Sequence, residues 1–324
     1  MKPSPSPSPS LLIGLAAMLG LAAPLAAAVA AQEPQEPAAA STNAIIVTAQ
    51  RSGAPMWTIE TPHGAVILVG ELRNVPKSTP WQPERLQEAT AEASRVILGL
   101  QPKISPGDIL RLIFKGGKFT KLPGKTTASD YLNAEQLARL AALEEEYDKD
   151  FARKSFLMTS FDFLTKRLRF NKNTADDAGD VVKKAASRAK VPTTRAGQVR
   201  GKDMLDSLAD AEPQSHIPCL EAAMTAAEIG PDLVEQRGAD WRAFRIPEVM
   251  DNPLEIALGQ CWPWADPDVG NELRSVWIEQ ITAATSAQGV TLAVVPLRVL
   301  AEQDGVLDQL EAAGFPIGGP LWRK

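Results

Sequence analysis

The sequence predicts an α/β fold, in which a central mixed β-sheet is flanked by helices and carries a helical insertion. Three observations support this class. Two β-rich runs near residue 60 are separated by a turn, a strand-helix-strand pattern follows, and a late buried strand lies between two helical stretches. With 324 residues, of which 44% are hydrophobic and 23% charged, the chain is long enough to bury a large core.

The predicted sheet begins with a hairpin. Met56 to Glu60 and Ala65 to Gly70 are rich in β-forming residues, and residues 61–64 between them have the composition of a turn. A helix capped by Ser78-Thr79, with Pro80 in its first turn, is expected to follow. The apolar run Val96-Ile97-Leu98 then predicts a buried strand, which completes an α/β layer.

The middle of the chain, from about residue 105 to 189, has a helical pattern and predicts an insertion on the sheet. One helix is expected to begin at Ser105-Pro106, a second is capped by Asn133, and a third runs from Phe151 to about Phe170. The phenylalanines of this region can line a pocket, but a core between helices is the simpler interpretation. Val191-Pro192-Thr193 predicts a further strand.

The last third predicts helices around one buried strand. The expected elements, in chain order, are helices at 218–229, at 246–258 and from 266 to 287, a strand at 291–295, a helix at 305–313 and a closing strand at 315–317.

The N-terminus has the features of a secretory signal. Lys2 and a Pro-Ser repeat precede an apolar stretch from Leu11 to Ala31, and small residues stand before Gln32. This pattern predicts a signal peptide over residues 1–31, cleaved after Ala30 or Ala31, and a periplasmic location. The stretch is also about long enough to span a bilayer, so an uncleaved anchor is the alternative and the only membrane contact expected.

Residues 32–54 predict a flexible tether, because they begin with a run rich in Pro, Ala and Glu. Within them, Ala44 to Arg51 resembles the segment that opens many TonB-dependent receptors, which fits a Gram-negative envelope. An alternating edge strand is the other interpretation of these eight residues. Residues 55–324 form the expected folded domain.

Cys219 and Cys261 are the only two cysteines, and an even count in an exported protein favours a disulfide bond between them. His216 has a metal-like spacing to Cys219. The chain contains only two histidines, however, so a closed zinc site lacks ligands.

Charge and motifs exclude several function classes. The formal net charge of −5 argues against nucleic acid as a partner, because phosphate binding needs a concentrated basic surface. The chain has no G-x-S-x-G elbow, Walker loop or dinucleotide fingerprint, so we expect no serine triad and no cofactor. The only short basic run is interpreted as a solvated loop, and it contains Lys115, Lys118, Lys121 and Lys125.

Two arginines stand at the ends of apolar runs whose motifs point to a known family. Gly70-Glu71-Leu72-Arg73 ends the second run, and Val295-Pro296-Leu297-Arg298-Val299 ends the late one. With Met56-Trp57 and the stretch after Asp304, these runs resemble the TraB/GumN (Tiki-like) family over about residues 55 to 320. The resemblance implies a ChaN- and erythromycin-esterase-like fold and the activity of a metal-dependent hydrolase or peptidase.

The chain departs from that family at the positions of the metal ligands. The family's two histidines correspond to Arg73 and Arg298, its third-strand glutamate to Gly99, and a further glutamate to Ala196. A guanidinium group has no lone pair for a metal and does not deprotonate in proteins. The sequence therefore predicts a pseudoenzyme with no catalytic residues and no metal.

Arg73 and Arg298 both follow apolar strands, where an α/β sheet has its crevice. An ordinary salt bridge, in which Glu71 neutralises Arg73, is the simpler interpretation. The functional hypothesis is that Arg73, Arg298 and Glu71 form an anion pocket for an envelope peptide or protein. The expected function is thus that of an exported, non-catalytic binding protein. The alternatives are a metal-dependent hydrolase with relocated ligands, including a carboxylate-only Mg or Ca site, and a structural partner of a TonB-linked system.

Overall fold

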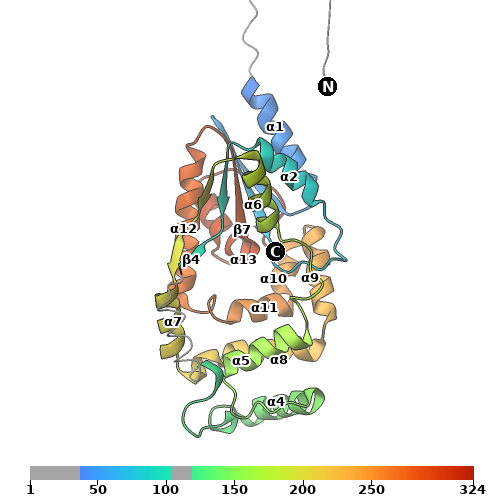
Figure 1. Cartoon of the computed structure of the whole chain (residues 1–324), viewed down its shortest axis with the longest axis vertical. Coiled ribbons are helices and arrows are strands. Elements are labelled where there is room, and N and C mark those ends of the chain that lie inside the picture. The colour runs from blue at the N-terminus through green and yellow to red at the C-terminus, as the bar shows by residue number, and fades with distance from the viewer. Residues whose placement is uncertain (1–36, 104–118) are drawn as a thin grey trace, which may run out of the picture. The chain divides into compact units, whose positions relative to one another are not determined.

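A computed structural model of the protein describes residues 37–103 and 119–324. Its strands are β1 (Met56–Thr61), β2 (Gly64–Glu71), β3 (Arg95–Leu98), β4 (Gln101–Lys103), β5 (Thr193–Arg195), β6 (Gln198–Arg200), β7 (Gly289–Pro296) and β8 (Ile317–Gly318). Six of them form a sheet in the order β5-β3-β7-β2-β1-β8, and β4 pairs with β6 separately (Figure 1). Strands β5, β3, β7 and β2 are parallel, whereas β1 is antiparallel to both of its neighbours. The predicted mixed sheet is confirmed.

Helices cover both faces of this sheet, as predicted. They are α1 (Pro37–Gln50), α2 (Pro83–Glu92), α4 (Ala134–Tyr147), α5 (Phe156–Asp162), α6 (Ala178–Ala189), α7 (Gly201–Asp210), α8 (Ile217–Ile229), α9 (Asp232–Arg242), α10 (Ile246–Asp251), α11 (Pro253–Gln260), α12 (Pro267–Thr285), α13 (Leu297–Ala301) and α14 (Val306–Ala312). Shorter turns are η1 (Ala128–Asp130), the π-helical η2 (Phe163–Arg167) and η3 (Pro213–His216). Helices α1, α2 and α6 pack together over one face, and α12 packs with α14 over the other.

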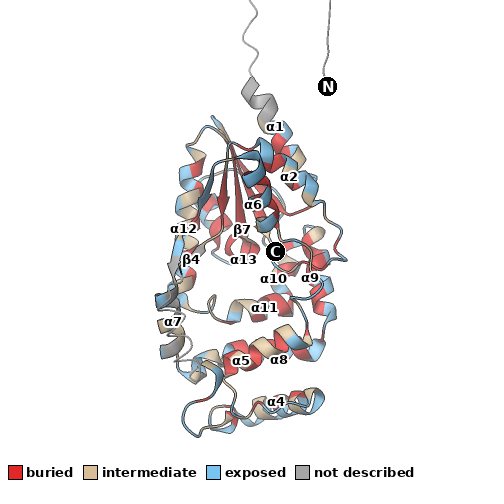
Figure 2. Cartoon of the chain, viewed as in Figure 1, coloured by how far each residue is buried: buried red, intermediate tan, exposed pale blue. Residues whose placement is uncertain are grey.

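Strands β2 and β7 form the buried centre of the sheet. Every residue of each strand except the first and the last is buried, and Figure 2 shows these strands in red. Strands that are buried on both faces have continuous apolar sequences, which is the pattern from which both were predicted. The hairpin between β1 and β2 also forms as predicted, with Thr61 opposite Gly64.

Helix α2 begins at Pro83, three residues after Pro80, where the sequence predicted the first turn. The reason is tertiary packing of the preceding segment. Thr79 is buried, and the ring of Trp81 packs edge-to-face on Trp241, with 5.9 Å between the ring centroids. These contacts hold the segment in a non-helical conformation until the next proline, which suits a first helical position.

The structure corrects the prediction for residues 37–50, which form helix α1 instead of a tether or an edge strand. The segment is rich in alanine, a strong helix former. One face of α1 is buried against the sheet and α2, through Ile45, Ile46 and Ala49, and this packing holds the segment in place. Some sequence predictions lie outside the described residues: the signal peptide over residues 1–31, the helix at Ser105-Pro106, and Lys115 and Lys118 of the basic run.

The helices of the middle of the chain form a core of their own. Helices α11, α8 with α5, and α4 lie in successive layers (Figure 1), and the buried residues come from two segments, 122–168 and 219–261. Phe151, Phe156 and Phe163 are buried there, which confirms that the phenylalanines build a core. Helix α6, in contrast, packs on α2 and the sheet.

A disulfide bond between Cys219 and Cys261 joins α8 to the end of α11, as predicted. Both cysteines are buried within the helical core. Within the described residues, no helix has the length and apolar character that crossing a membrane requires.

We expect native protein to resist thiol alkylation until a reductant and a denaturant are added, because both cysteines are bonded and buried. Replacing both with alanine should lower the free energy of unfolding by roughly 2–5 kcal/mol, since the bond closes a long loop in the unfolded chain. Mass spectrometry after alkylation and urea unfolding measure the two effects. Two thiols that react freely in native protein would contradict the bond.

Candidate functional site at the carboxyl edge of the sheet

The parallel strands bring the positions highlighted by the sequence to one edge of the sheet. Strands β2 and β7 are paired in register, and Arg73 and Arg298 each lie two residues beyond their paired ends. Gly99 directly follows β3, and Ala196 directly follows β5. In open α/β sheets, ligands bind outside the carboxyl ends of the strands, so this edge is the candidate site.

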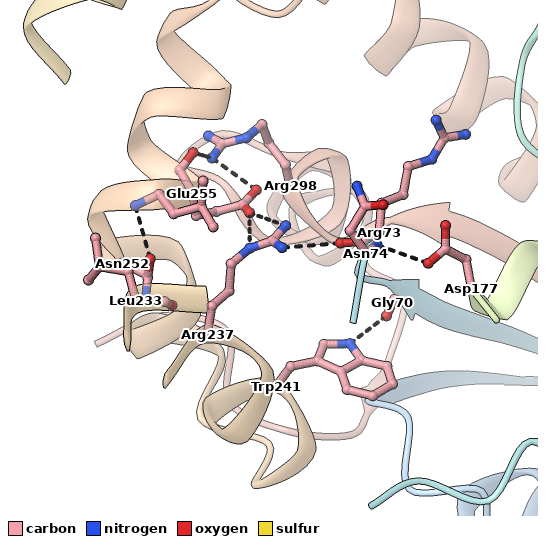
Figure 3. Close-up of polar contacts among 11 residues, drawn as sticks. Gly70, Arg73, Asn74, Asp177, Leu233, Arg237, Trp241, Asn252, Glu255 and Arg298 are labelled. Carbon is pink, nitrogen blue, oxygen red and sulfur yellow. Dashed lines mark hydrogen bonds and ion pairs between the residues drawn. The ribbon is translucent and has the colours of Figure 1, made fainter. Parts of the chain in front are cut away.

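Gly70 permits close packing where β2 ends. A Cβ atom at this position would lie 2.9 Å from the ring of Trp57 and 3.0 Å from Cδ1 of Leu297, which is tighter than a well-packed interior allows. The carbonyl of Gly70 also accepts a hydrogen bond of 2.9 Å from Nε1 of Trp241 (Figure 3). The glycine of the motif therefore serves packing, and its carbonyl fixes helix α9 to the edge.

Arg298 is part of a buried ion network (Figure 3), which we call the Arg237–Glu255–Arg298 triad. One terminal nitrogen of Arg298 lies 3.0 Å from Oε1 of Glu255 and also donates to the Glu255 backbone carbonyl. On the other side, Nε of Arg237 donates to Oε2 of Glu255 over 2.6 Å. The side chains of Arg298, Glu255 and Arg237 are only 14%, 7% and 5% exposed, so the network is largely shielded from solvent.

The triad also connects to the loop after β2, since Arg237 donates to the backbone carbonyl of Arg73 over 3.1 Å. Burial alone would raise the pKa of Glu255, but the two neighbouring arginines hold it below its ordinary value. Glu255 is therefore ionised at neutral pH, and the three groups together carry one net positive charge.

The residues at this edge do not fit a metal ion. Both carboxylate oxygens of Glu255 already accept from arginines, and a guanidinium group has no lone pair to offer. Gly99 brings no ligand, and Ala196 is buried with its backbone N–H bonded to Leu98. Within residues 37–103 and 119–324, no three His, Cys, Asp or Glu side chains are placed to hold a metal together.

Arg73 points away from Arg298 (Figure 3), so the structure does not bring the two arginines together on one anion. Its side chain is 78% exposed, and its Nε lies 3.9 Å from Oε2 of Glu71. Glu71 is itself only 10% exposed and accepts a hydrogen bond of 2.8 Å from the backbone N–H of Gly179 in α6. Burial raises the pKa of Glu71, against the opposing effects of Arg73 and of the Gly179 N–H.

A second carboxylate, that of Asp177, fixes the loop that carries Arg73. The backbone N–H of Asn74 donates to Oδ1 of Asp177 over 2.9 Å (Figure 3). Asn74 has a φ of 58°, in the left-handed region that asparagine tolerates better than most residues. Burial raises the pKa of Asp177, while the Asn74 N–H and Arg73 act to lower it.

Glu255, Arg237 and Asp177 are site residues that the sequence analysis missed. One signal for Glu255 is present in the sequence: it is the only charged residue in the apolar run Pro253 to Gly259. Arg237 and Asp177 lie in polar stretches and resemble ordinary surface residues, so no comparable signal identifies them.

Residue types suited to nucleophilic catalysis meet elsewhere, in a cavity of about 490 Å³ in the helical part. It is lined by Ser155 and by His216, whose pKa is lowered by burial. The Ser155 hydroxyl, however, accepts from the backbone N–H of Met158 at the start of α5 and donates to the carbonyl of Phe119. It serves as a helix cap, which agrees with the lack of a nucleophile elbow in the sequence.

Comparison with known proteins identifies one match. A family model described as the TraB/PrgY/gumN family matches residues 55–317. No curated protein and no solved structure is significantly similar to the chain. The match begins just before β1 and ends at the first residue of β8, so it includes the six-stranded sheet, except for Gly318, and its carboxyl edge.

Proposed function

This chain belongs to the TraB/PrgY/gumN family, and we propose that it is a binding protein without metal-dependent catalysis. The observation that carries the proposal is the pairing of Arg298 with Glu255. Arg298 stands at one of the two positions where the resemblance implies a histidine ligand, and there it is engaged in an ion network with Glu255. A metal at this edge would have to displace buried arginines from their carboxylate, which is costly in a desolvated site.

We assign recognition of the ligand to Arg73 alone. Arg298 is engaged by Glu255, whereas Arg73 is mostly exposed and its acidic neighbour Glu71 lies 3.9 Å from Nε. This exposure leaves the terminal nitrogens of Arg73 open to a bidentate pair with a carboxylate, which supports the assignment. The ligand we propose is the carboxylate of an envelope peptide or protein, with Glu71 and Asp177 holding the loop in place.

The proposal is tested with a fluorescent peptide that ends in a free carboxylate, titrated against the same peptide with an amidated end. Arg73→Ala should weaken binding of the free-carboxylate peptide by roughly 10- to 150-fold, the equivalent of a lost charged hydrogen bond of about 1.5–3 kcal/mol. Arg85→Ala is the matched control, because Arg85 is also exposed and lies 2.8 Å from a glutamate, Glu88. Equal binding of both peptides, or equal losses in both variants, would refute a role for Arg73.

A periplasmic location is part of the proposal, and the apolar N-terminal stretch and the disulfide bond support it. Protein recovered from the periplasmic fraction of a Gram-negative host should have the mass of a chain that begins at Ala31 or Gln32. Intact-mass spectrometry measures this directly. A full-length mass confined to the membrane fraction would instead support the uncleaved anchor.

A further inference from the structure

The helical part contains another cavity, of about 360 Å³, between the end of α4 and the π-helical turn η2. Three aromatic residues, Tyr147, Phe151 and Phe163, are part of its lining, and we call them the aromatic floor. The ring centroids of Phe151 and Phe163 are 5.1 Å apart, and those of Tyr147 and Phe163 are 6.0 Å apart. The volume lies in the lower part of the range of about 300–1,000 Å³ that is typical of small-molecule sites.

The rim of this cavity is strongly basic, with the side chains of Lys149, Lys166, Arg167 and Arg169. The acidic residue in the lining, Asp162, is already engaged by both Lys154 and Lys166. Glu146 pairs with Arg167 over 2.6 Å, which leaves Lys149 and Arg169 to set the local potential. Asp148 and Asp150 flank Lys149 in the chain but are not among the lining residues, so the lining itself has four basic side chains and one acidic one. This local excess of positive charge can attract anions.

Two residues of the cavity lining, Tyr147 and Arg167, carry buried donor atoms that lack a partner. Among the described residues, neither the hydroxyl of Tyr147 nor Nε of Arg167 makes a hydrogen bond of normal distance and angle, although the Arg167 guanidinium is close enough to the Tyr147 hydroxyl to oppose the effect of burial on its pKa. The guanidinium of Arg167 lies over the ring of Tyr147, with Cζ 5.0 Å from the centroid. Burial raises the pKa of Tyr147, so its hydroxyl stays protonated, and both groups can donate. The partner that would satisfy them is an acceptor.

The backbone at this wall is also unusual. Lys166 and Arg167 belong to η2, where the N–H of Leu168 donates to the carbonyl of Phe163 over 3.1 Å, five residues back along the chain. Single turns of this π type occur frequently at functional sites.

We propose that this cavity binds a small organic anion, in which a phosphate or carboxylate group is attached to an aromatic body. The basic rim supplies the charge, the two unpaired donors supply hydrogen bonds for the acidic group, and the aromatic floor covers the ring. This site shares no residue with the edge of the sheet, so it goes beyond the proposed function.

The test is calorimetric titration of the full chain with benzyl phosphate, inorganic phosphate and benzyl alcohol, and with phenylacetate in parallel. Benzyl phosphate or phenylacetate should bind at a single site and at least about tenfold more tightly than inorganic phosphate, because burial of the ring adds to binding. The tighter of these two ligands identifies the acidic group. Failure of both to bind, or binding of benzyl alcohol as tight as theirs, would overturn the proposal.

Variants locate the site. Lys149→Gln/Arg169→Gln should weaken binding at least about tenfold, and Tyr147→Phe should weaken it about tenfold by removing one donor to a charged group. The control Lys183→Gln/Lys184→Gln, on α6, changes the net charge equally and should bind as wild type does. Arg73→Ala should also bind normally, which separates this site from the one at the sheet edge. Equal losses in the rim and control variants would show that general electrostatics, and not this cavity, accounts for the binding.

Discussion

Glu255→Ala is expected to destabilise the protein by about 3–5 kcal/mol, because it leaves two buried arginines without their counter-charge. Arg237 and Arg298 are 5% and 14% exposed, so water cannot replace the lost carboxylate without opening the structure. The free energy of unfolding, measured by circular dichroism in urea, gives the effect.

Two variants show whether the effect belongs to the triad. Arg298→Met should cost less than Glu255→Ala, because Glu255 keeps its pairing with Arg237. Glu302→Ala removes a carboxylate from a partly exposed pair with Arg274, at 2.6 Å, and should cost only about 0.2–1 kcal/mol. If Glu255→Ala costs no more than Glu302→Ala, the triad does not hold the edge together.

The same pairing fixes the pH dependence of stability. The pKa of Glu255 in the folded protein lies below its ordinary value of 4.5, which approximates the unfolded state. Its contribution is therefore fully present above pH 4.5 and is lost as the pH falls through the folded pKa. The difference in stability between wild type and Glu255→Ala should accordingly be constant near neutral pH and shrink below pH 4.5 in the urea measurement.

The sheet could be predicted because its strands have simple physical signatures. Buried parallel strands require continuous apolar residues, and both β2 and β7 show them. The predictions failed where tertiary contacts decide the local structure. Helix α1 is stabilised by burial of one of its faces against the sheet. Helix α2 starts later in the chain than predicted because Trp81 packs on Trp241. Neither contact is visible in the local sequence.

The candidate site was predictable in position but not in its pairing. Strands β2 and β7 pair in register, and an arginine follows the end of each strand by two residues. Arg73 and Arg298 therefore lie at the same edge of the sheet, as the sequence predicted. The partner of Arg298 comes from another helix, 43 residues away in the chain, and the other arginine of the triad, Arg237, comes from a third helix. Pairings of this range depend on how helices pack, which sequence periodicity does not specify.

We expect the protein to bind no metal at this edge. Restoring the two histidines alone should not create metal binding. Wild type and Arg73→His/Arg298→His should both take up well below one equivalent of zinc, manganese or cobalt after dialysis. In the double variant Glu255 stays paired with Arg237, so it offers no further ligand, and two imidazoles fall short of the three ligands of a catalytic site. Elemental analysis, with visible spectra of cobalt-loaded protein, measures the uptake.

Adding Gly99→Glu to the two histidines is expected to give the first variant that binds metal. No atom lies within 4 Å of a Cβ placed on Gly99, so the edge has room for a carboxylate there, directly after β3. The triple variant then has three ligands at one edge of the sheet, and metal uptake in it alone would show that the fold keeps the geometry while the side chains exclude the ion. One equivalent of metal in wild type, together with peptidase activity that a chelator abolishes, would contradict the proposed non-catalytic function. It would favour relocated ligands, because neither Arg73 nor Arg298 can coordinate a cation.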